Sequence, residues 1–367
     1  MFSSKERKMN TLSSYIKAYV EPVVQLGMPS YKANQLSAKI IGFKEEGDNI
    51  FTVKLRPRRR SKFIFKPGQH LNILVEINGK TLKRTFSISS PLTALQKDGI
   101  IELSIKRQPN GLVTNWLPLN LKIGKKLYLE QPQGDFTYRD DPAGKASLML
   151  AAGSGITPII SMLESCSSTD LKDLFLIYHV NDSCETPFDN RLQTLAKKGL
   201  SIAVVDSIKD GFICQEQLER VVAGRELGNI YCCGPSGYMS KAKKIVVSLN
   251  NPNTSPPAFH CEYFGSISVE GQTDTSQRIE WIQRSGKTLV STENKGTLLE
   301  AAEAAGLKPL HGCRSGICHQ CTAQKTSGRV RNVLTNEVSS AGEEEVQLCI
   351  CVAESDASFV VRERTVQ

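Results

Sequence analysis

Four cysteines near the end of the chain have the spacing of ligands to an iron–sulfur cluster. Three form a Cys-x4-Cys-x2-Cys run and the fourth follows after 27 further residues: Cys313, Cys318, Cys321 and Cys349. A [2Fe–2S] cluster needs four thiolates, and three of them on one tight loop leave backbone amides near the sulfurs. Gly312 and Gly316 allow that backbone to come close to the metal. The spacing therefore predicts a [2Fe–2S] site.

Two other kinds of metal site and one other ligand compete with this interpretation. A structural zinc site favours two Cys-x2-Cys pairs, which this run does not supply. A Rieske centre needs two histidine ligands at spacings that His311 and His319 do not have. Cys351 lies two residues past Cys349, on the same side of a predicted strand, and is the alternative fourth ligand. We prefer Cys349 for its spacing, and we expect Arg314 to help balance the cluster's negative charge.

A glycine-rich turn is the second chemical signal. Gly-Ser-Gly-Ile-Thr-Pro, residues 153–158, follows the apolar run SLMLAA and opens a helical stretch. Glycine lets backbone approach a pyrophosphate, and the amides at a helix N-terminus attract anions. Residues 111–117 likewise form a glycine-led entry to a short helix. Both turns are expected to bind phosphate groups.

The elements that position these residues follow three successive patterns. From about Ser37 to Glu130, short β-branched runs separated by turn residues predict an antiparallel β-barrel. After Pro142, apolar runs alternate with helical stretches, which predicts an α/β domain with a parallel sheet. A polar linker precedes a hairpin, a strong helix and the cysteines. We expect an extension at 1–36, the barrel at 37–142, the α/β domain at 143–264, the linker at 265–277 and the cysteine domain at 278–367.

Composition limits the class of protein. Apolar residues make up 40% and charged residues 23%, which is typical of globular domains. No run of 18 apolar residues predicts a membrane span, and no apolar segment near the start predicts a secretion signal. Eleven cysteines without such a signal favour metal or redox chemistry in a reducing compartment. We expect a cytoplasmic protein, with the inner face of the membrane as the alternative location.

The net charge of +9 lies entirely before residue 277, where 35 Lys and Arg stand against 26 Asp and Glu. No nucleic-acid-binding signature accompanies this charge, so phosphorylated cofactors and a negatively charged partner explain it better. The basic run 56–62 is expected to be a solvated loop, or else to touch such a partner or anionic lipid. Residues 11–24 have helical spacing, which predicts a helix packed on its own domain or resting on a membrane.

Arg84-Thr85-Phe86-Ser87, at the end of a predicted strand, completes a set of motifs in which the chain resembles the ferredoxin–NADP reductase superfamily. The resemblance implies that Arg84 holds a flavin phosphate, Phe86 lies against the isoalloxazine and Ser87 reaches flavin N5. Phe86 stands where tyrosine is usual, so one hydroxyl contact is lost. The superfamily's second phosphate turn is matched by Gly111, Val113 and Thr114, and its closing barrel strand by residues 132–136.

The nicotinamide site follows from the same resemblance. Gly153, Gly155, Thr157 and Pro158 match the Gly-x-Gly-x-Thr-Pro turn, in which the threonine lies beside the nicotinamide. The matching Cys-Gly-Pro motif, whose cysteine lies near nicotinamide C4, is Cys233, Gly234 and Pro235. Phe264 corresponds to the aromatic of an E-x-F segment that covers the flavin ring, or is an ordinary linker aromatic. The implied catalytic residues are Ser87, Thr157 and Cys233.

The order of flavin barrel, NAD(P)H domain and C-terminal plant-type ferredoxin of β-grasp fold resembles the single-chain reductases of multicomponent oxygenases. It implies an oxidoreductase with FAD (FMN is the alternative), NAD(P)H and a [2Fe–2S] cluster, which passes single electrons to a partner. Residues 65–80 and 327–332 most resemble reductases of membrane-bound acyl-CoA desaturases. The alternatives are a reductase for a ring-hydroxylating dioxygenase or a hybrid cluster protein, and a redox sensor.

The choice between NADH and NADPH is left open by the sequence. An acidic residue at a strand end favours the free 2′-hydroxyl of NADH, whereas basic residues favour the 2′-phosphate of NADPH. Asp182 and Asp206 follow two predicted strands, but Lys209 comes close behind the second. These signals conflict.

Overall fold

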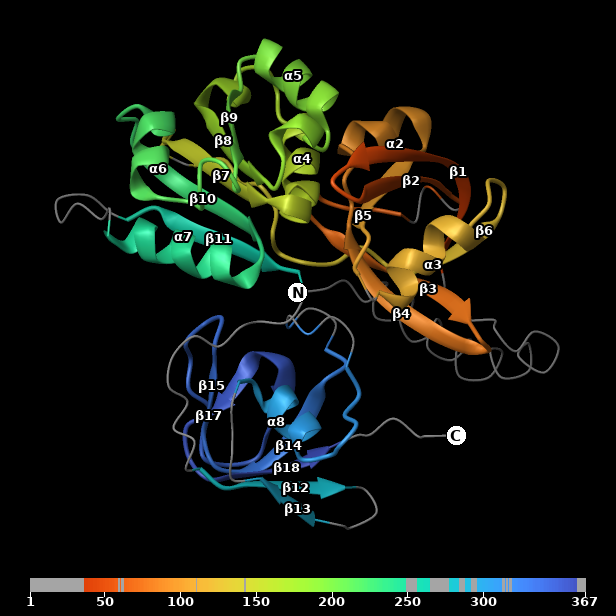
Figure 1. Cartoon of the computed structure of the whole chain (residues 1–367), viewed down its shortest axis with the longest axis vertical. Helices are drawn as coiled ribbons and strands as arrows, with labels where there is room; N and C mark the ends of the chain where they lie inside the picture. The colour runs from red at the N-terminus through yellow and green to blue at the C-terminus, as the bar shows by residue number, and fades with distance from the viewer. Residues whose placement is uncertain are drawn as a thin grey trace, which may run out of the picture.

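Three large β-sheets and one two-stranded sheet form three units in the described part of the computed structural model, and each unit has its own hydrophobic core (Figure 1). The helix expected at 11–24 lies outside the residues that the structure describes. Those residues are 36–58, 60, 63–109, 111–141, 143–248, 256–264, 277–283, 288–291, 296–311, 314, 316 and 319–361.

The first sheet is antiparallel throughout and carries the order β4-β3-β6-β1-β2-β5. Ile88, just past β4, forms an isolated bridge with Leu103 of β5, which brings the two edges of the sheet together as a barrel. Alternate side chains of its strands fill the core. The strands are β1 (Leu36–Gly47), β2 (Ile50–Pro57), β3 (His70–Ile77), β4 (Lys80–Ser87), β5 (Ile101–Lys106) and β6 (Lys126–Leu129).

Two short helices pack against the barrel core through Leu95 and Leu117. The helix α3 (Leu112–Asn120) is the one expected after the glycine at 111, whereas α2 (Leu92–Asp98) was not among the expected elements. It ends at Gly99, whose φ of 67° is the left-handed conformation in which glycine commonly terminates a helix.

The second sheet is parallel, in the order β11-β10-β7-β8-β9. Its central strands are buried along their whole length because helices cover both faces. β7 leads to β8 on one side while β10 lies on the other, so the loops after β7 and β10 meet at a topological switch point. The elements are β7 (Ala146–Ala152), α4 (Ile156–Ser165), β8 (Leu174–Val180), α5 (Asp189–Lys197), β9 (Ser201–Asp206), α6 (Gln215–Val222), β10 (Leu227–Gly234), α7 (Ser236–Ser248) and β11 (Ala258–Tyr263).

The third sheet is mixed, in the order β13-β12-β18-β14-β16, with a small β15-β17 pair beside it. It lies below the other two units in Figure 1. Its helix α8 begins with a capping box, in which Thr297 and Glu300 bond each other's backbone amides. The elements are β12 (Ile279–Gln283), β13 (Thr288–Ser291), α8 (Leu298–Ala304), β14 (Thr322–Ser327), β15 (Val330–Asn332), β16 (Glu344–Gln347), β17 (Cys351–Ala353) and β18 (Ala357–Val361).

Across the part of the chain that the structure describes, no helix has both the length and the apolar composition needed to cross a bilayer.

Replacing Trp281 by alanine should destabilise the third unit by about 3–5 kcal/mol, because its indole ring fills the core and stacks on Phe359 at 5.2 Å. Chemical denaturation of the full chain, followed by the fluorescence or absorbance of that unit, measures the loss. Val290 on the adjacent strand is 45% exposed, so Val290→Ala is the control and should change stability by less than about 0.5 kcal/mol. Equal effects of both changes would contradict this account of the core.

Candidate functional site

The predicted flavin motif lies at the end of β4, in the barrel wall. Thr85 Oγ1 donates to Asn72 Oδ1 of the paired strand at 2.6 Å, so its side chain is fixed within the sheet. Phe86 is partly buried against the barrel core. Arg84 Nη1 donates to the backbone carbonyl of Lys83 at 2.8 Å.

The buried carboxylate of Glu262 connects this motif to the parallel sheet. Ser87 Oγ donates to Glu262 Oε2 at 3.2 Å, and His70 Nδ1 lies 2.8 Å from Glu262 Oε1. All three residues are at most 5% exposed. A buried carboxylate is costly unless it is hydrogen-bonded, and here its partners come from a different domain. Neither Glu262 nor His70 was among the predicted site residues.

The two predicted nicotinamide motifs lie against each other at the switch point of the parallel sheet. The Gly153–Gly155 turn follows β7 and leads into α4, and Thr157 Oγ1 donates back to Ser154 O at 2.9 Å. A Cβ atom on Gly155 would stand 2.0 Å from the carbonyl oxygen of Cys233. Only glycine therefore allows this close approach of the turn to the end of β10.

Cys233 is the residue that brings the nicotinamide motif next to Glu262. The parallel register of β10 and β11 sets Cys233 directly opposite Glu262. Burial, and then the negative charge of Glu262, raise the pKa of the Cys233 thiol well above its usual value. The thiol is consequently neutral at physiological pH, and it is not activated as a nucleophile.

The other predicted cofactor-binding residues range from fully buried to exposed. Val113 is 1% exposed and packs in the barrel core, so only its backbone can reach a ligand. Thr114 Oγ1 accepts a hydrogen bond from Gln108 N at 3.2 Å and closes the turn that begins at Gly111. Gly234 ends β10, and the carbonyl of Pro235 accepts from the first turn of α7. Phe264 follows β11 and is 37% exposed.

A cavity of about 470 Å³ lies where the three units meet. His70 and Glu262 line it together with Tyr263, and the cysteine loop contributes Gly316 and His319. Among the described residues, none bonds the buried Nε2 of His70. The volume is typical of a small-molecule site, and the unpartnered nitrogen fits a ligand with polar edges such as an isoalloxazine or a nicotinamide.

Two of the four predicted cluster ligands lie side by side in the third unit. The Sγ atoms of Cys321 and Cys349 are 3.2 Å apart, and both side chains are buried. Gly316 N donates to Cys349 Sγ at 3.3 Å, the kind of amide–sulfur contact that an iron–sulfur cluster requires. Cys313 and Cys318 lie outside the described residues. The donor chemistry that is described fits a [2Fe–2S] cluster.

The surroundings of Cys351 differ from those of Cys349. Cys349 lies in the short helical turn Leu348–Ile350, and Cys351 begins β17, so the two do not share one strand face as the sequence spacing suggested. Burial raises the pKa of Cys351 to about 12, which makes its thiolate unfavourable without a metal.

Arg314 was expected to balance the negative charge of the cluster. Its guanidinium bonds the carboxylate of Glu303, so part of the positive charge of Arg314 is already neutralised.

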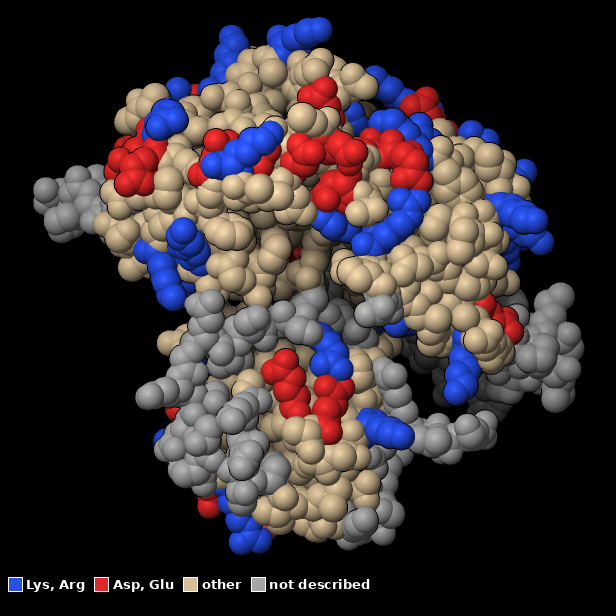
Figure 2. Space-filling view, viewed as in Figure 1, with Lys and Arg blue, Asp and Glu red and all other residues tan. Residues whose placement is uncertain are grey.

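The surface charge is mixed on the face that Figure 2 shows. Lys and Arg side chains of the barrel and the parallel sheet alternate with Asp and Glu over this face and form no continuous basic field. On this face, the net positive charge that the sequence places before residue 277 is interspersed with acidic side chains.

Family models match all three units of the chain. The oxidoreductase FAD-binding domain matches residues 43–138, the oxidoreductase NAD-binding domain residues 149–244, and the 2Fe-2S iron-sulfur cluster binding domain residues 282–354. The structure of phthalate dioxygenase reductase is similar in fold, with a TM-score of 0.57 at 20% identity over 89% of this chain and 97% of that one.

Curated relatives agree with these matches. The NADPH oxidoreductase of Mycobacterium tuberculosis is 27% identical over 336 residues, which cover 91% of this chain and 86% of that protein. The glycine betaine monooxygenase reductase subunit of Chromohalobacter salexigens is 30% identical over 297 residues, 73% of this chain and 79% of that one. With FAD-binding, NAD-binding and [2Fe–2S] domains in this order, the chain belongs to the family of NAD(P)H-dependent electron-transfer reductase components of oxygenase systems.

Proposed function

We propose that the reacting groups of this reductase meet around Glu262. That carboxylate comes from the sheet that carries the Gly-x-Gly-x-Thr-Pro turn, it bonds Ser87 of the flavin motif, and it lines the cavity that the cysteine loop also borders. When bound, the flavin takes a hydride from NAD(P)H and releases electrons singly to the cluster. The convergence of three units on one cavity is the observation that carries the proposal.

The chain's own residues then have distinct tasks. Arg84, Thr85, Phe86 and the turn that begins at Gly111 hold the flavin, and Glu262 fixes the direction of the Ser87 hydroxyl by accepting its hydrogen bond. The turn at 153–158 and the Cys-Gly-Pro segment 233–235 hold the nicotinamide. Cys233, opposite Glu262 in the register of β10 and β11, places a small buried side chain beside the nicotinamide turn. Phe264 covers the flavin, and the cluster is held by Cys313, Cys318, Cys321 and Cys349.

Asp206 and Lys209, the residues that gave conflicting signals for NADH and NADPH, form an ion pair with each other in the structure. The carboxylate of Asp206 accepts hydrogen bonds from the backbone amides of Ser183, Ile208 and Lys209, in the loops that follow β8 and β9. These bonds hold the pKa of the carboxyl well below its usual value. Lys209 Nζ also lies 3.2 Å from Asp206 Oδ2. Because neither charge is isolated, the charges at this strand end favour neither nucleotide.

For the electron acceptor we propose a fatty acyl desaturase or hydroxylase. The support is the resemblance of residues 65–80 and 327–332 to reductases of acyl-CoA desaturases. A ring-hydroxylating dioxygenase or another oxygenase is the second candidate, because relatives are named as reductases of glycine betaine and 3-ketosteroid-9-alpha monooxygenases. Mixing the anaerobically reduced protein with each purified acceptor, the desaturase in vesicles, and timing reoxidation of the cluster separates the two.

Anaerobic titration of the purified protein with NADPH, and separately with NADH, should bleach both flavin and cluster absorbance. One flavin takes two electrons and one cluster takes one, so complete reduction needs about 1.5 equivalents of nucleotide. The nucleotide that reduces the protein at the lower concentration is the preferred one. Bleaching that stops at one equivalent, with the cluster absorbance unchanged, would exclude the proposed electron path.

Replacing Gly155 by alanine should slow reduction of the flavin by NAD(P)H about 100-fold, since the new methyl group displaces the nicotinamide turn from β10. Stopped-flow absorbance measures the rate. A methyl group added at Gly237 in α7 would meet no neighbouring side chain or loop within 4 Å, so Gly237→Ala is the matched control and should keep the wild-type rate. A normal rate in Gly155→Ala would refute the assignment of this turn.

Cys349→Ala should abolish the cluster, and Cys351→Ala should retain it, because the described amide and thiol contacts go to Cys349. Iron and sulfide content and the electron paramagnetic resonance signal of the reduced protein distinguish the variants. Flavin reduction by nucleotide should persist in both, which shows that the rest of the chain is folded. The reverse pattern of cluster loss would make Cys351 the fourth ligand.

A further inference from the structure

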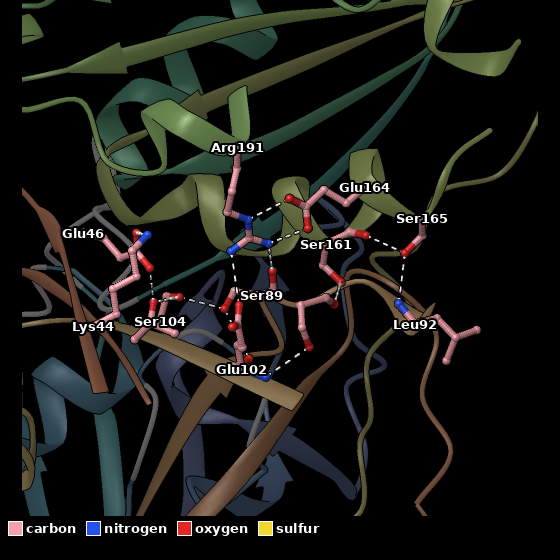
Figure 3. A network of polar contacts seen from close by, with 12 residues as sticks. Lys44, Glu46, Ser89, Leu92, Glu102, Ser104, Ser161, Glu164, Ser165 and Arg191 are labelled. Atoms are coloured by element: carbon pink, nitrogen blue, oxygen red, sulfur yellow. Dashed lines mark hydrogen bonds and ion pairs between the residues drawn. The ribbon is translucent and has the colours of Figure 1, made fainter. Parts of the chain in front are cut away.

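Helix α4 is tied to the barrel by side chains beyond the Gly-x-Gly-x-Thr-Pro turn (Figure 3). Ser161 Oγ donates to the backbone carbonyl of Ser90 at 2.7 Å, and both residues are fully buried. One turn later, Ser165 Oγ accepts a hydrogen bond from Leu92 N at 3.2 Å. The chain segment just past the flavin motif therefore docks directly on the helix that begins at the nicotinamide turn.

Arg191 of α5 bonds both partners of this contact, helix α4 and the barrel segment after β4. Its guanidinium forms a fork with Glu164 of α4, with two nitrogen–oxygen distances of 2.7 Å. It also donates to the backbone carbonyl of Ser89 at 2.6 Å and lies 3.4 Å from Glu102 of the barrel. Burial opposes the charge of Arg191, but the bonds to Glu164 and the charge of Glu102 outweigh it and raise its pKa, so the guanidinium stays charged.

The barrel segment that receives these bonds is itself fixed. Ser89 N donates to Glu102 O at 2.9 Å, and Ser89 Oγ lies 2.7 Å from Ser104 Oγ. Ser90 Oγ accepts from Glu102 N at 3.0 Å. Because both sides of the contact are hydrogen-bonded within their own domains, movement at the contact would shift whole elements rather than single side chains.

We propose that Arg191 is a positioning residue for electron entry: with Ser161, it sets the separation between the nicotinamide turn and the flavin strand. Ser161 lies four residues after Thr157, and Ser89 two residues after Ser87, so the contact is close in sequence to both partners of the transfer. Arg191 itself touches neither motif. The inference rests on the proposed assignment of the flavin to β4 and of the nicotinamide to the turn before α4.

Charge balance explains why an arginine serves at this point. Glu102 from the barrel and Glu164 from α4 both approach the guanidinium, and although Lys54 Nζ also lies 3.4 Å from Glu102, among the described residues only Arg191 bridges the two carboxylates across the domain boundary. Without this bridge, their repulsion would push the domains apart. A lysine keeps the charge but cannot form the fork with Glu164 while also reaching Ser89 O.

The test measures each step separately in Arg191→Ala, Arg191→Lys and Ser161→Ala. Flavin content and melting temperature report folding, difference spectra with oxidised nucleotide report its Kd, and stopped-flow absorbance reports the rate constant of flavin reduction. The control is Arg225→Ala, which removes an exposed ion pair with Asp173 inside the same domain.

We expect Arg191→Ala to lower the reduction rate constant about 100-fold while flavin content and nucleotide Kd stay within about twofold of wild type. Arg191→Lys and Ser161→Ala should lose about tenfold, and Arg225→Ala should match wild type. A wild-type rate in Arg191→Ala, or a rate loss that only follows lost flavin or nucleotide, overturns the inference. If Arg191→Ala fails to fold, Ser161→Ala decides by the same criteria. Absence of flavin reduction in the wild-type protein would instead refute the proposed function.

Discussion

The carboxylate of Glu262 has its hydrogen-bond partners in another domain, and the arrangement of the barrel against the parallel sheet depends on this. Both its oxygens are buried and occupied, one by Ser87 and one by His70. Separating the domains would either hydrate the carboxylate or leave it buried without partners, and both change the environment of the flavin motif. The same bonds therefore hold the domain boundary and the Arg84–Ser87 motif.

A second set of bonds, around Arg191, joins α4 and α5 to the barrel. Together the two sets hold β11 and α4 against the barrel at separate points, which restricts rotation as well as separation. Two fixed points suit a reaction whose rate depends on the orientation and distance of two rings. Apolar contacts between the domains, such as that of Met162 near Gly68, add buried surface area but do little to fix the relative orientation of the domains.

Several features were predictable from the sequence because they depend on local spacing. The cysteine run, the glycine turn after an apolar strand and the change from β-hairpins to β-α units each need only a short window of residues. The fold class and the cofactors follow from them. The assignment of Phe264 and of the individual catalytic residues stays a prediction.

Other features depend on contacts between distant segments and were missed for that reason. Glu262 lies 192 residues from His70, and only the register of β11 on β10 brings it to the barrel. Its signal in the sequence is the glutamate of the E-x-F segment, of which only the aromatic residue was predicted to have a role. Arg191 looks like an ordinary surface residue of an amphipathic helix. The side chain of Val113, predicted to bind cofactor, packs in the core because it lies with Leu117 on the inward face of α3, whereas Leu112 is exposed.

β11 carries Glu262, which lines the cavity between the three units, and through residues 265–276 it is joined covalently to the cluster-binding unit. Twelve residues span at most about 40 Å, so the third unit stays within that distance of the end of β11. Such a tether gives an effective concentration on the order of millimolar. A separate ferredoxin at micromolar levels does not reach this effective concentration, so the covalent link alone favours the chain's own cluster-binding unit over a free one.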